Sequence, residues 1–136
     1  MRRILFAALL ATSASFASAT PTPKEQLLVP PKDARHFTIS SPATKSGDIW
    51  SWKMADGSTA YRMSLNLRGW ITETDEVITP GTDGRPAKIA IRGYTDSGEA
   101  TENFSVDPSG IAHWKTSVDE GSAPYAGKRY NTYGGP

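Results

Sequence analysis

Residues 47–70, GDIWSWKMADGSTAYRMSLNLRGW, decide the fold class. Asp56-Gly57 is a strong hairpin signal, because both central positions of a type I′ turn need a positive φ. Apolar and polar residues alternate on both sides of this dipeptide, as they do in strands with one buried face. The stretch therefore predicts two antiparallel strands joined by a tight turn.

A two-residue turn centred on Asp56-Gly57 also predicts a register for the two strands. In this register, three cross-strand pairs would build an apolar face: Met54 with Thr59, Trp52 with Tyr61, and Trp50 with Met63. Leu65 and Leu67 would continue this face along the second strand, because side chains of a strand alternate between faces. The opposite face would carry the polar set Ser51, Lys53, Arg62, Ser64, Asn66 and Arg68.

The rest of the chain repeats the pattern of short strands and turns. Alternating segments at 70–79, 87–94, 100–106 and 111–116 are separated by turn sequences rich in Gly, Pro, Asp and Ser. Helical periodicity is absent beyond the leader. We therefore expect an all-β fold, an antiparallel meander of about six or seven strands, forming a curled single sheet, a half-barrel or a sandwich.

The N-terminus has the form of a secretory signal peptide. Met1-Arg2-Arg3 is a basic start, residues 4–11 are apolar, and Ala17-Ser18-Ala19 is a small-x-small cleavage site. The apolar run is shorter than the roughly 20 residues that span a bilayer. Removal of residues 1–19 would leave a secreted or periplasmic chain and not an integral membrane protein.

Three further segments follow the predicted leader. Residues 20–34 are proline-rich and predict an extended lead-in with one helical turn near residues 24–28. Residues 35–117 form the predicted antiparallel β domain. Residues 118–136 lack alternation and carry several tyrosines and glycines, so we expect an irregular tail or a truncated linker.

Charge and cysteine content exclude several classes of function. Of the 15 Lys and Arg residues, Arg2 and Arg3 belong to the leader, so 13 remain against 14 Asp and Glu. A nearly neutral chain gives no reason to expect nucleic-acid binding, which needs a basic surface. The chain has no cysteine, which rules out disulfides, thiolate nucleophiles and thiolate metal sites.

Few residues have a pattern that indicates catalysis. His36 and His113 are far apart and lack metal-ligand spacing, so we expect ordinary strand residues and no metal or cofactor. Glu73 and Asp75 would share one face of a strand beside Glu76, and paired carboxylates can serve acid–base catalysis. A solvated strand face or edge is the preferred interpretation, and we predict no catalytic residue.

The aromatic residues of the hairpin define a candidate ligand or packing face. Trp50, Trp52, Tyr61 and Met63 are predicted to cluster there. Such a face could hold a sugar or an apolar ligand. Cross-strand aromatic pairs also stabilise small sheets, and the shared face with leucines favours packing.

Three stretches resemble the N-terminal region of secreted bacterial amidohydrolase-family proteins. They are PKEQLLVPPKDARHFTISSPATKSGDIWSW (23–52), DGRPAKIAIRGYTDSGEATENF (83–104) and GIAHWKTSVDEGSAPYAGKRY (110–130). The resemblance implies a leader and a β-rich segment that precede a metal-dependent TIM-barrel hydrolase. The barrel's histidine-x-histidine pair has no counterpart here, because His36 and His113 do not match it.

The resemblance leads to an expectation about function. The chain would be a non-catalytic secreted β-domain, truncated or fragmentary, with a structural role and a missing C-terminal barrel as partner. One alternative is a free-standing periplasmic module that binds an apolar or lipid-like ligand. A second alternative is a small secreted hydrolase that uses Glu73 and Asp75.

Overall fold

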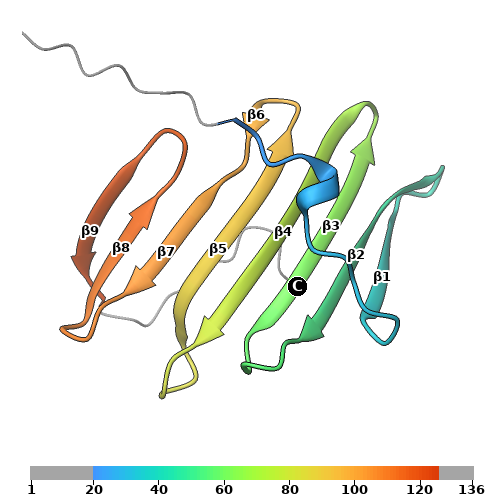
Figure 1. Cartoon of the computed structure of the whole chain (residues 1–136). Coiled ribbons are helices and arrows are strands. Elements are labelled where there is room, and N and C mark those ends of the chain that lie inside the picture. The colour runs from blue at the N-terminus through green and yellow to red at the C-terminus, as the bar shows by residue number, and fades with distance from the viewer. Residues whose placement is uncertain (1–19, 126–136) are drawn as a thin grey trace, which may run out of the picture.

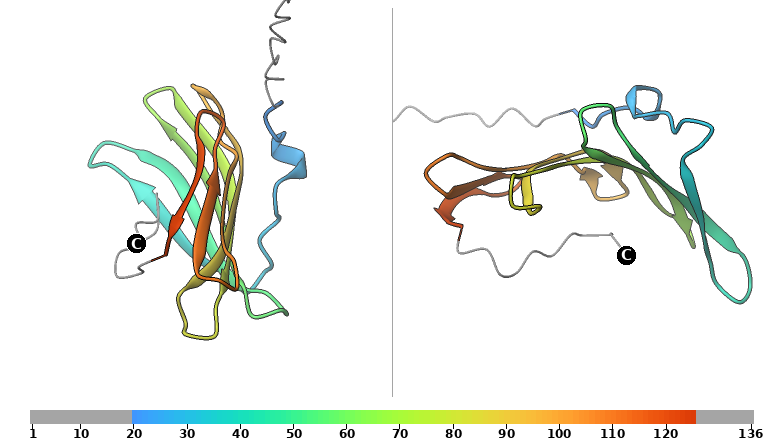
Figure 2. Two further views of the ribbon diagram at one scale, coloured as in Figure 1. Left: turned by 90° about the vertical axis from the view of Figure 1, so that its left-hand side faces the viewer. Right: turned by 90° about the horizontal axis from the view of Figure 1, so that it is seen from below.

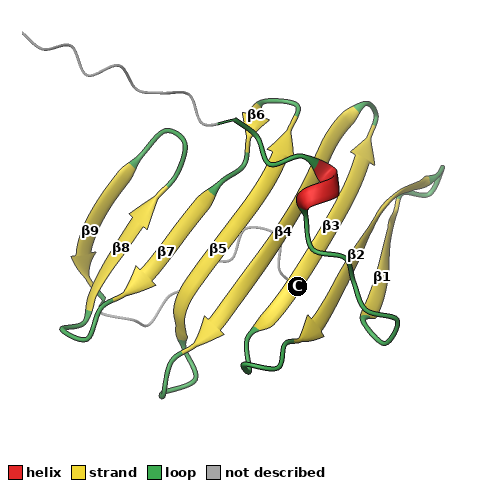
Figure 3. Cartoon of the chain, in the orientation of Figure 1, coloured by secondary structure: helices red, strands yellow, loops and turns green. Residues whose placement is uncertain are grey.

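The computed structural model describes residues 20–125. They form one antiparallel β-sheet and a single turn of 3-10 helix, η1 (Figure 3). The elements are η1 (Lys24–Gln26), β1 (Arg35–Ser40), β2 (Lys45–Lys53), β3 (Thr59–Leu67), β4 (Trp70–Pro80), β5 (Pro86–Thr95), β6 (Gly98–Glu99), β7 (Glu102–Val106), β8 (Ile111–Lys115) and β9 (Glu120–Pro124).

The strands follow one another across the sheet nearly as they do along the chain (Figure 1). The order is β1-β2-β3-β4-β5-β7-β8-β9, with the short β6 paired to β5, so the sheet is a nine-stranded meander that does not close into a barrel. The predicted all-β antiparallel class is confirmed. The strand count exceeds the expected six or seven because β6 and β9 carry no alternating pattern in the sequence.

Strand β9 lies in the segment expected to be an irregular tail from residue 118. Its sequence, EGSAP, has low β propensity, so its pairing with β8 supplies what its own residues do not. Gly121 lies opposite Trp114, and a Cβ on this glycine would come within 2.4 Å of the indole ring. The predicted leader (1–19) and residues 126–136 of the predicted tail lie outside the described residues.

Three hairpin loops share one geometry and join strands at the same end of the sheet (Figure 1). In the five-residue segment of each loop, the main-chain amide of the first residue donates to the carbonyl of the fifth, and the amide of the fourth residue donates to the carbonyl of the first. The fourth residue is a glycine with a positive φ. These are three-residue loops with a bulge at glycine. They comprise Met54–Ser58, Gly81–Arg85 and Asp107–Ile111.

The predicted register of the first hairpin is wrong by one residue. Asp56-Gly57 is part of a three-residue loop, so Trp52 pairs with Ala60 and Trp50 with Arg62. The two-residue geometry with two positive φ values occurs at the next turn, at Arg68 and Gly69 (φ 55° and 94°). A slip of one residue moves side chains to the other face.

The correct register separates the four residues of the predicted aromatic face. Trp50 and Trp52 lie on one face of the sheet with Arg62, whereas Tyr61 and Met63 lie on the other. The first face also carries Asp75 and Arg92, so the tryptophans belong to the more polar side. Tyr61 and Met63 remain on the side where most apolar side chains gather.

Residues 20–34 form a strap that crosses one face of the sheet in front of its central strands (Figure 1). The predicted helical turn is present as η1. Leu27, directly after this turn, faces the sheet and is buried, with only 4% of its surface exposed. We call the covered side the strap face. Figure 2 shows the β1–β2 end of the sheet curling away from the strap, which makes the opposite side concave there.

The opposite side is the apolar face. Most of its strand residues have half-buried or exposed side chains, Ile89 and Ala112 being buried exceptions, and no described segment crosses it (Figure 2). Only four apolar residues of the described chain are fully buried: Leu27, Ala60, Ile89 and Ala112. The apolar face comprises Phe37, Ile49, Tyr61, Met63, Leu65, Leu67, Trp70, Ile78, Ile89, Ile91, Phe104, Val106 and Trp114.

Candidate functional site

A cluster of charged side chains is buried between the strap and the sheet. Cross-strand pairing brings it together, because Arg62, Asp75 and Arg92 lie opposite one another on β3, β4 and β5. Glu73 lies two residues from Asp75 and therefore on the same face. Residue Asp75 is 1% exposed, Glu73 5% and Arg62 6%, so these charges need partners inside the protein.

Asp75 connects the sheet to the strap. Arg92 donates two hydrogen bonds to its carboxylate, from Nε at 3.0 Å and from Nη2 at 2.5 Å. The main-chain amide of Leu28 donates to Oδ2 at 2.8 Å. A bidentate pair with arginine is a strong form of charged hydrogen bond. Asp75 thus stabilises a strand and the segment that crosses it.

Glu73 makes the second connection to the strap. Lys24 donates to its Oε1 at 2.6 Å, and Ser64 on β3 donates to the same oxygen at 2.7 Å. Arg62 donates to Oε2 and also to the carbonyls of Met63 and Thr74. Every charge of this group therefore has hydrogen-bond partners.

The two carboxylates share a face, as the sequence predicts, but they are not solvated and do not lie at an edge. Strand β4 is central, and the strap covers the side on which Glu73 and Asp75 lie. The alternation of the hairpin places Arg62 among polar neighbours but does not pair it with Glu73. The charges at alternate positions of adjacent strands were the signal for an ion-pair layer.

The environment of Glu73 shifts its ionisation. Burial raises the pKa of Glu73, but the hydrogen bonds from Lys24, Arg62 and Ser64 outweigh burial and hold the pKa below its usual value. A lowered pKa means that the ionised carboxylate stabilises the folded chain. That contribution is present above the pKa of the unfolded chain, about 4.3, and disappears as the pH falls through the folded pKa.

The Glu73→Gln variant is expected to lose about 1–2 kcal/mol at pH 7, because its neutral amide keeps the shape but not the charged hydrogen bonds. The gap to the wild type should close as the pH falls from about 5 to below the folded pKa. Urea unfolding of both chains at several pH values measures this difference. A gap that stays constant down to pH 3 would contradict the assignment.

Glu76 has the opposite environment. It lies on the apolar face, where Tyr61 and Ile91 are its cross-strand neighbours. Burial raises the pKa of Glu76, and the nearby charge of Glu102 raises it further. Because the folded pKa lies above the unfolded value, the ionised form of Glu76 destabilises the fold at neutral pH.

The Glu76→Gln variant is therefore expected to melt at a higher temperature than the wild type at pH 7. The gain should vanish below about pH 4, where the carboxyl is protonated in both the folded and the unfolded chain. Thermal melts followed by circular dichroism at pH 7 and pH 3.5 test both points. A variant that is less stable at neutral pH would show that Glu76 has a stabilising partner.

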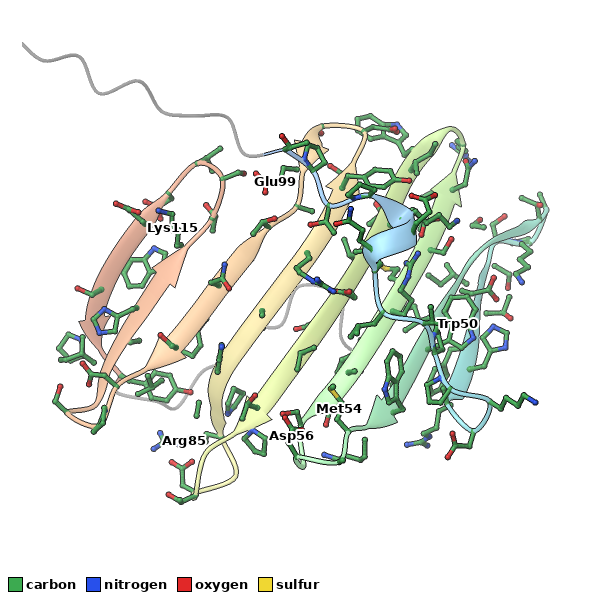
Figure 4. All side chains as sticks on the ribbon, in the orientation of Figure 1. Trp50, Met54, Asp56, Arg85, Glu99 and Lys115 are labelled. Atoms are coloured by element: carbon green, nitrogen blue, oxygen red, sulfur yellow. The ribbon has the colours of Figure 1, made fainter. Side chains whose placement is uncertain are left out.

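The two histidines lie on strands near opposite ends of the sheet. His36 on β1 stacks on Trp50, with ring centroids 5.1 Å apart and planes at 8° (Trp50 is labelled in Figure 4), and its Nε2 lies 2.6 Å from Asp48 Oδ1. His113 on β8 has its Nε2 3.2 Å from Asp107 Oδ2. Within residues 20–125, no group of three His, Asp or Glu side chains is placed to hold a metal ion.

Comparison of this chain with protein-family models, with curated proteins and with solved structures gives no match. In the part of the chain that the structure describes, no helix has the length and apolar character needed to cross a membrane. The class that the structure defines is an open, single-sheet antiparallel β domain with one strapped face and one apolar face.

Proposed function

We propose that this chain is a secreted, non-catalytic β-domain whose role is to pack, through its apolar face, against a further domain. By the resemblance of its sequence, that domain would be a metal-dependent barrel of the amidohydrolase kind. The observation that carries the proposal is the apolar face itself. A sheet with one apolar face is stable when a second layer covers that face.

The exposure of large apolar side chains on this face supports the proposal. Trp70 is 65% exposed, Phe37 46% and Leu67 45%, and all three lie on the apolar face. A contiguous exposed apolar surface on a folded domain marks an interaction site. The strap already occupies part of the other face, so the apolar face is the one suited to receive a partner.

The state of the buried carboxylates supports a non-catalytic role. A general acid near neutral pH needs a raised pKa and access to substrate. Glu73 has a lowered pKa, and both Glu73 and Asp75 are buried and bonded to arginine. The small-hydrolase alternative relied on these two carboxylates, and their ion pairs argue against it.

The secreted or periplasmic location is part of the proposal and depends on the leader sequence at residues 1–19. The basic start, short apolar run and small-residue cleavage site are the features of a signal peptide. A processed N-terminus at Thr20, measured by mass spectrometry of the exported chain, would support this location. An unprocessed chain retained in the cytoplasm would contradict it.

The packing role is tested by binding to a stated probe, the barrel of a secreted bacterial amidohydrolase from which its own β-rich front segment has been removed. Light scattering after gel filtration should detect a one-to-one complex with the wild-type chain. The Trp70→Lys variant puts a charge on the apolar face and should abolish the complex. Ser105→Lys is the matched control, because Ser105 is exposed on the strap face, and it should bind as the wild type does.

The second candidate is a module that binds an apolar or lipid-like ligand, and the concave side of the sheet favours it (Figure 2). The binding residues would be Tyr61 and Met63, because Trp50 and Trp52 lie on the other face. Native mass spectrometry distinguishes the two functions. A small molecule retained by the wild-type chain and lost in Met63→Lys would favour the ligand-binding module.

A further inference from the structure

The carboxylates of Glu76 and Glu102 interrupt the apolar face near its centre. Tyr61, Glu76, Ile91 and Glu102 form one row of side chains across β3, β4, β5 and β7. Along β4, the neighbours of Glu76 on this face are Thr74 and Ile78. An apolar and uncharged polar surface therefore surrounds a half-buried carboxylate, with an exposed second carboxylate close to it.

We infer that Glu76 and Glu102 are the points at which the apolar face receives a guanidinium or ammonium group of the domain that covers it. The inference rests on the proposed packing role and adds the chemistry of the partner. The covering surface is apolar and carries at least one cation positioned above β4 and β5. Arginine suits this position better than lysine, because its planar guanidinium is less strongly hydrated and can donate two parallel hydrogen bonds to one carboxylate.

Comparison with carboxylates of the described chain that do have partners supports this inference. Glu73 and Asp75 are bonded to arginine, Asp48 to Lys45, and Asp119 to the indole of Trp114. Within residues 20–125, neither an ion pair nor a hydrogen bond reaches the side chain of Glu76 or Glu102. Here the charge of Glu102 instead adds to burial in raising the pKa of Glu76.

Two cations on the strands of the apolar face contact groups other than these carboxylates. Lys53 at the end of β2 donates to Thr59 Oγ1 at 2.7 Å, and Arg35 on β1 lies over the ring of Phe37, 5.9 Å from its centroid. The central carboxylates therefore keep an unmatched negative charge. Covering them with a purely apolar surface would remove their water without replacing it, which is strongly unfavourable for a charged group. A partner cation removes that cost and also fixes the orientation of docking.

The test uses the full chain and two small probes with the same tail, octylguanidinium and octyl glucoside, below their micelle concentrations. Calorimetric titration should show that the wild type binds octylguanidinium at least about tenfold more tightly than octyl glucoside. The Glu76→Gln/Glu102→Gln double variant should bind both probes alike. Glu99→Gln, on the strap face and labelled in Figure 4, is the matched control and should keep the wild-type preference.

Each outcome decides the inference. Equal binding of the two probes to the wild type, a preference that survives in the double variant, or no binding of either probe would overturn it. If circular dichroism shows that the double variant does not fold, the single variant Glu102→Gln, at an exposed position, takes its place and should reduce the preference.

The failure of this inference is distinguishable from the failure of the packing role. A hydrolase barrel that binds the wild type and the double variant equally, but not Trp70→Lys, would leave the packing role intact without the charged anchor. A barrel that does not bind the wild type would contradict the packing role. The preference between the two probes would then still decide whether the carboxylates recognise a cation.

Discussion

Replacing Asp75 with alanine is expected to lower the free energy of unfolding by about 3–4 kcal/mol, because the change leaves an arginine and a main-chain amide without their acceptor. Arg92, whose side chain is 43% exposed, can regain water, and this keeps the effect at the lower end of the range for buried pairs. Leu28 loses its bond to the sheet, so the strap should loosen. Urea unfolding measures the first effect, and amide exchange at Leu28 measures the second.

The control for Asp75 is a solvent-exposed ion pair of the same chain, in which Lys115 Nζ lies 3.1 Å from Glu120 Oε2. Because these side chains are 71% and 70% exposed, Glu120→Ala should change the free energy of unfolding by at most about 0.5 kcal/mol. Asp75→Asn should fall between the two, because an amide oxygen can still accept from Leu28. An Asp75→Ala chain with wild-type stability and slow exchange at Leu28 would refute the connecting role of this residue.

The second large effect is expected at Gly93, where alanine should destabilise the chain by about 3–5 kcal/mol. Gly93 is buried on β5 and has a φ of 135°, a backbone conformation that residues other than glycine rarely adopt. A Cβ at this position would lie 2.0 Å from the carbonyl oxygen of Glu73 and 2.8 Å from the Cα of Thr74. Both are main-chain atoms of β4, so no side-chain rotation relieves the clash and the strands must separate.

Gly98 is the matched control for Gly93. Its φ is 116°, but a Cβ there would have no atom within 4 Å. Gly98→Ala therefore shows the backbone cost alone, about 1 kcal/mol. Thermal melts of the two variants separate backbone conformation from close approach. Equal melting temperatures for Gly93→Ala and Gly98→Ala would contradict the close contact between β4 and β5.

The all-β class and most strands could be predicted because alternation and turn residues are local signals. Register could not, since Asp-Gly is compatible with a two-residue turn and with a three-residue loop, and one residue decides the faces of Trp50 and Trp52. Strand β9 was missed because its residues carry no pattern of their own and depend on β8.

The ion-pair layer shows a different limit of sequence reasoning. Alternation correctly placed Glu73 and Asp75 on one face, but a polar face is normally assigned to solvent. Their burial depends on the strap, whose proline-rich sequence has no period that points to the sheet. The partners Lys24 and Leu28 come 49 and 47 residues before their carboxylates, a separation that local patterns do not cover.

That separation also determines when the strap can form during folding. We expect the meander to assemble from neighbouring hairpins, because hairpins close short loops and form early. The strap is made first by the ribosome but has no surface to bind until β3, β4 and β5 have paired. We therefore expect the earliest part of the described chain to be among the last to become ordered, so that Lys24 and Leu28 would report completion of the central sheet.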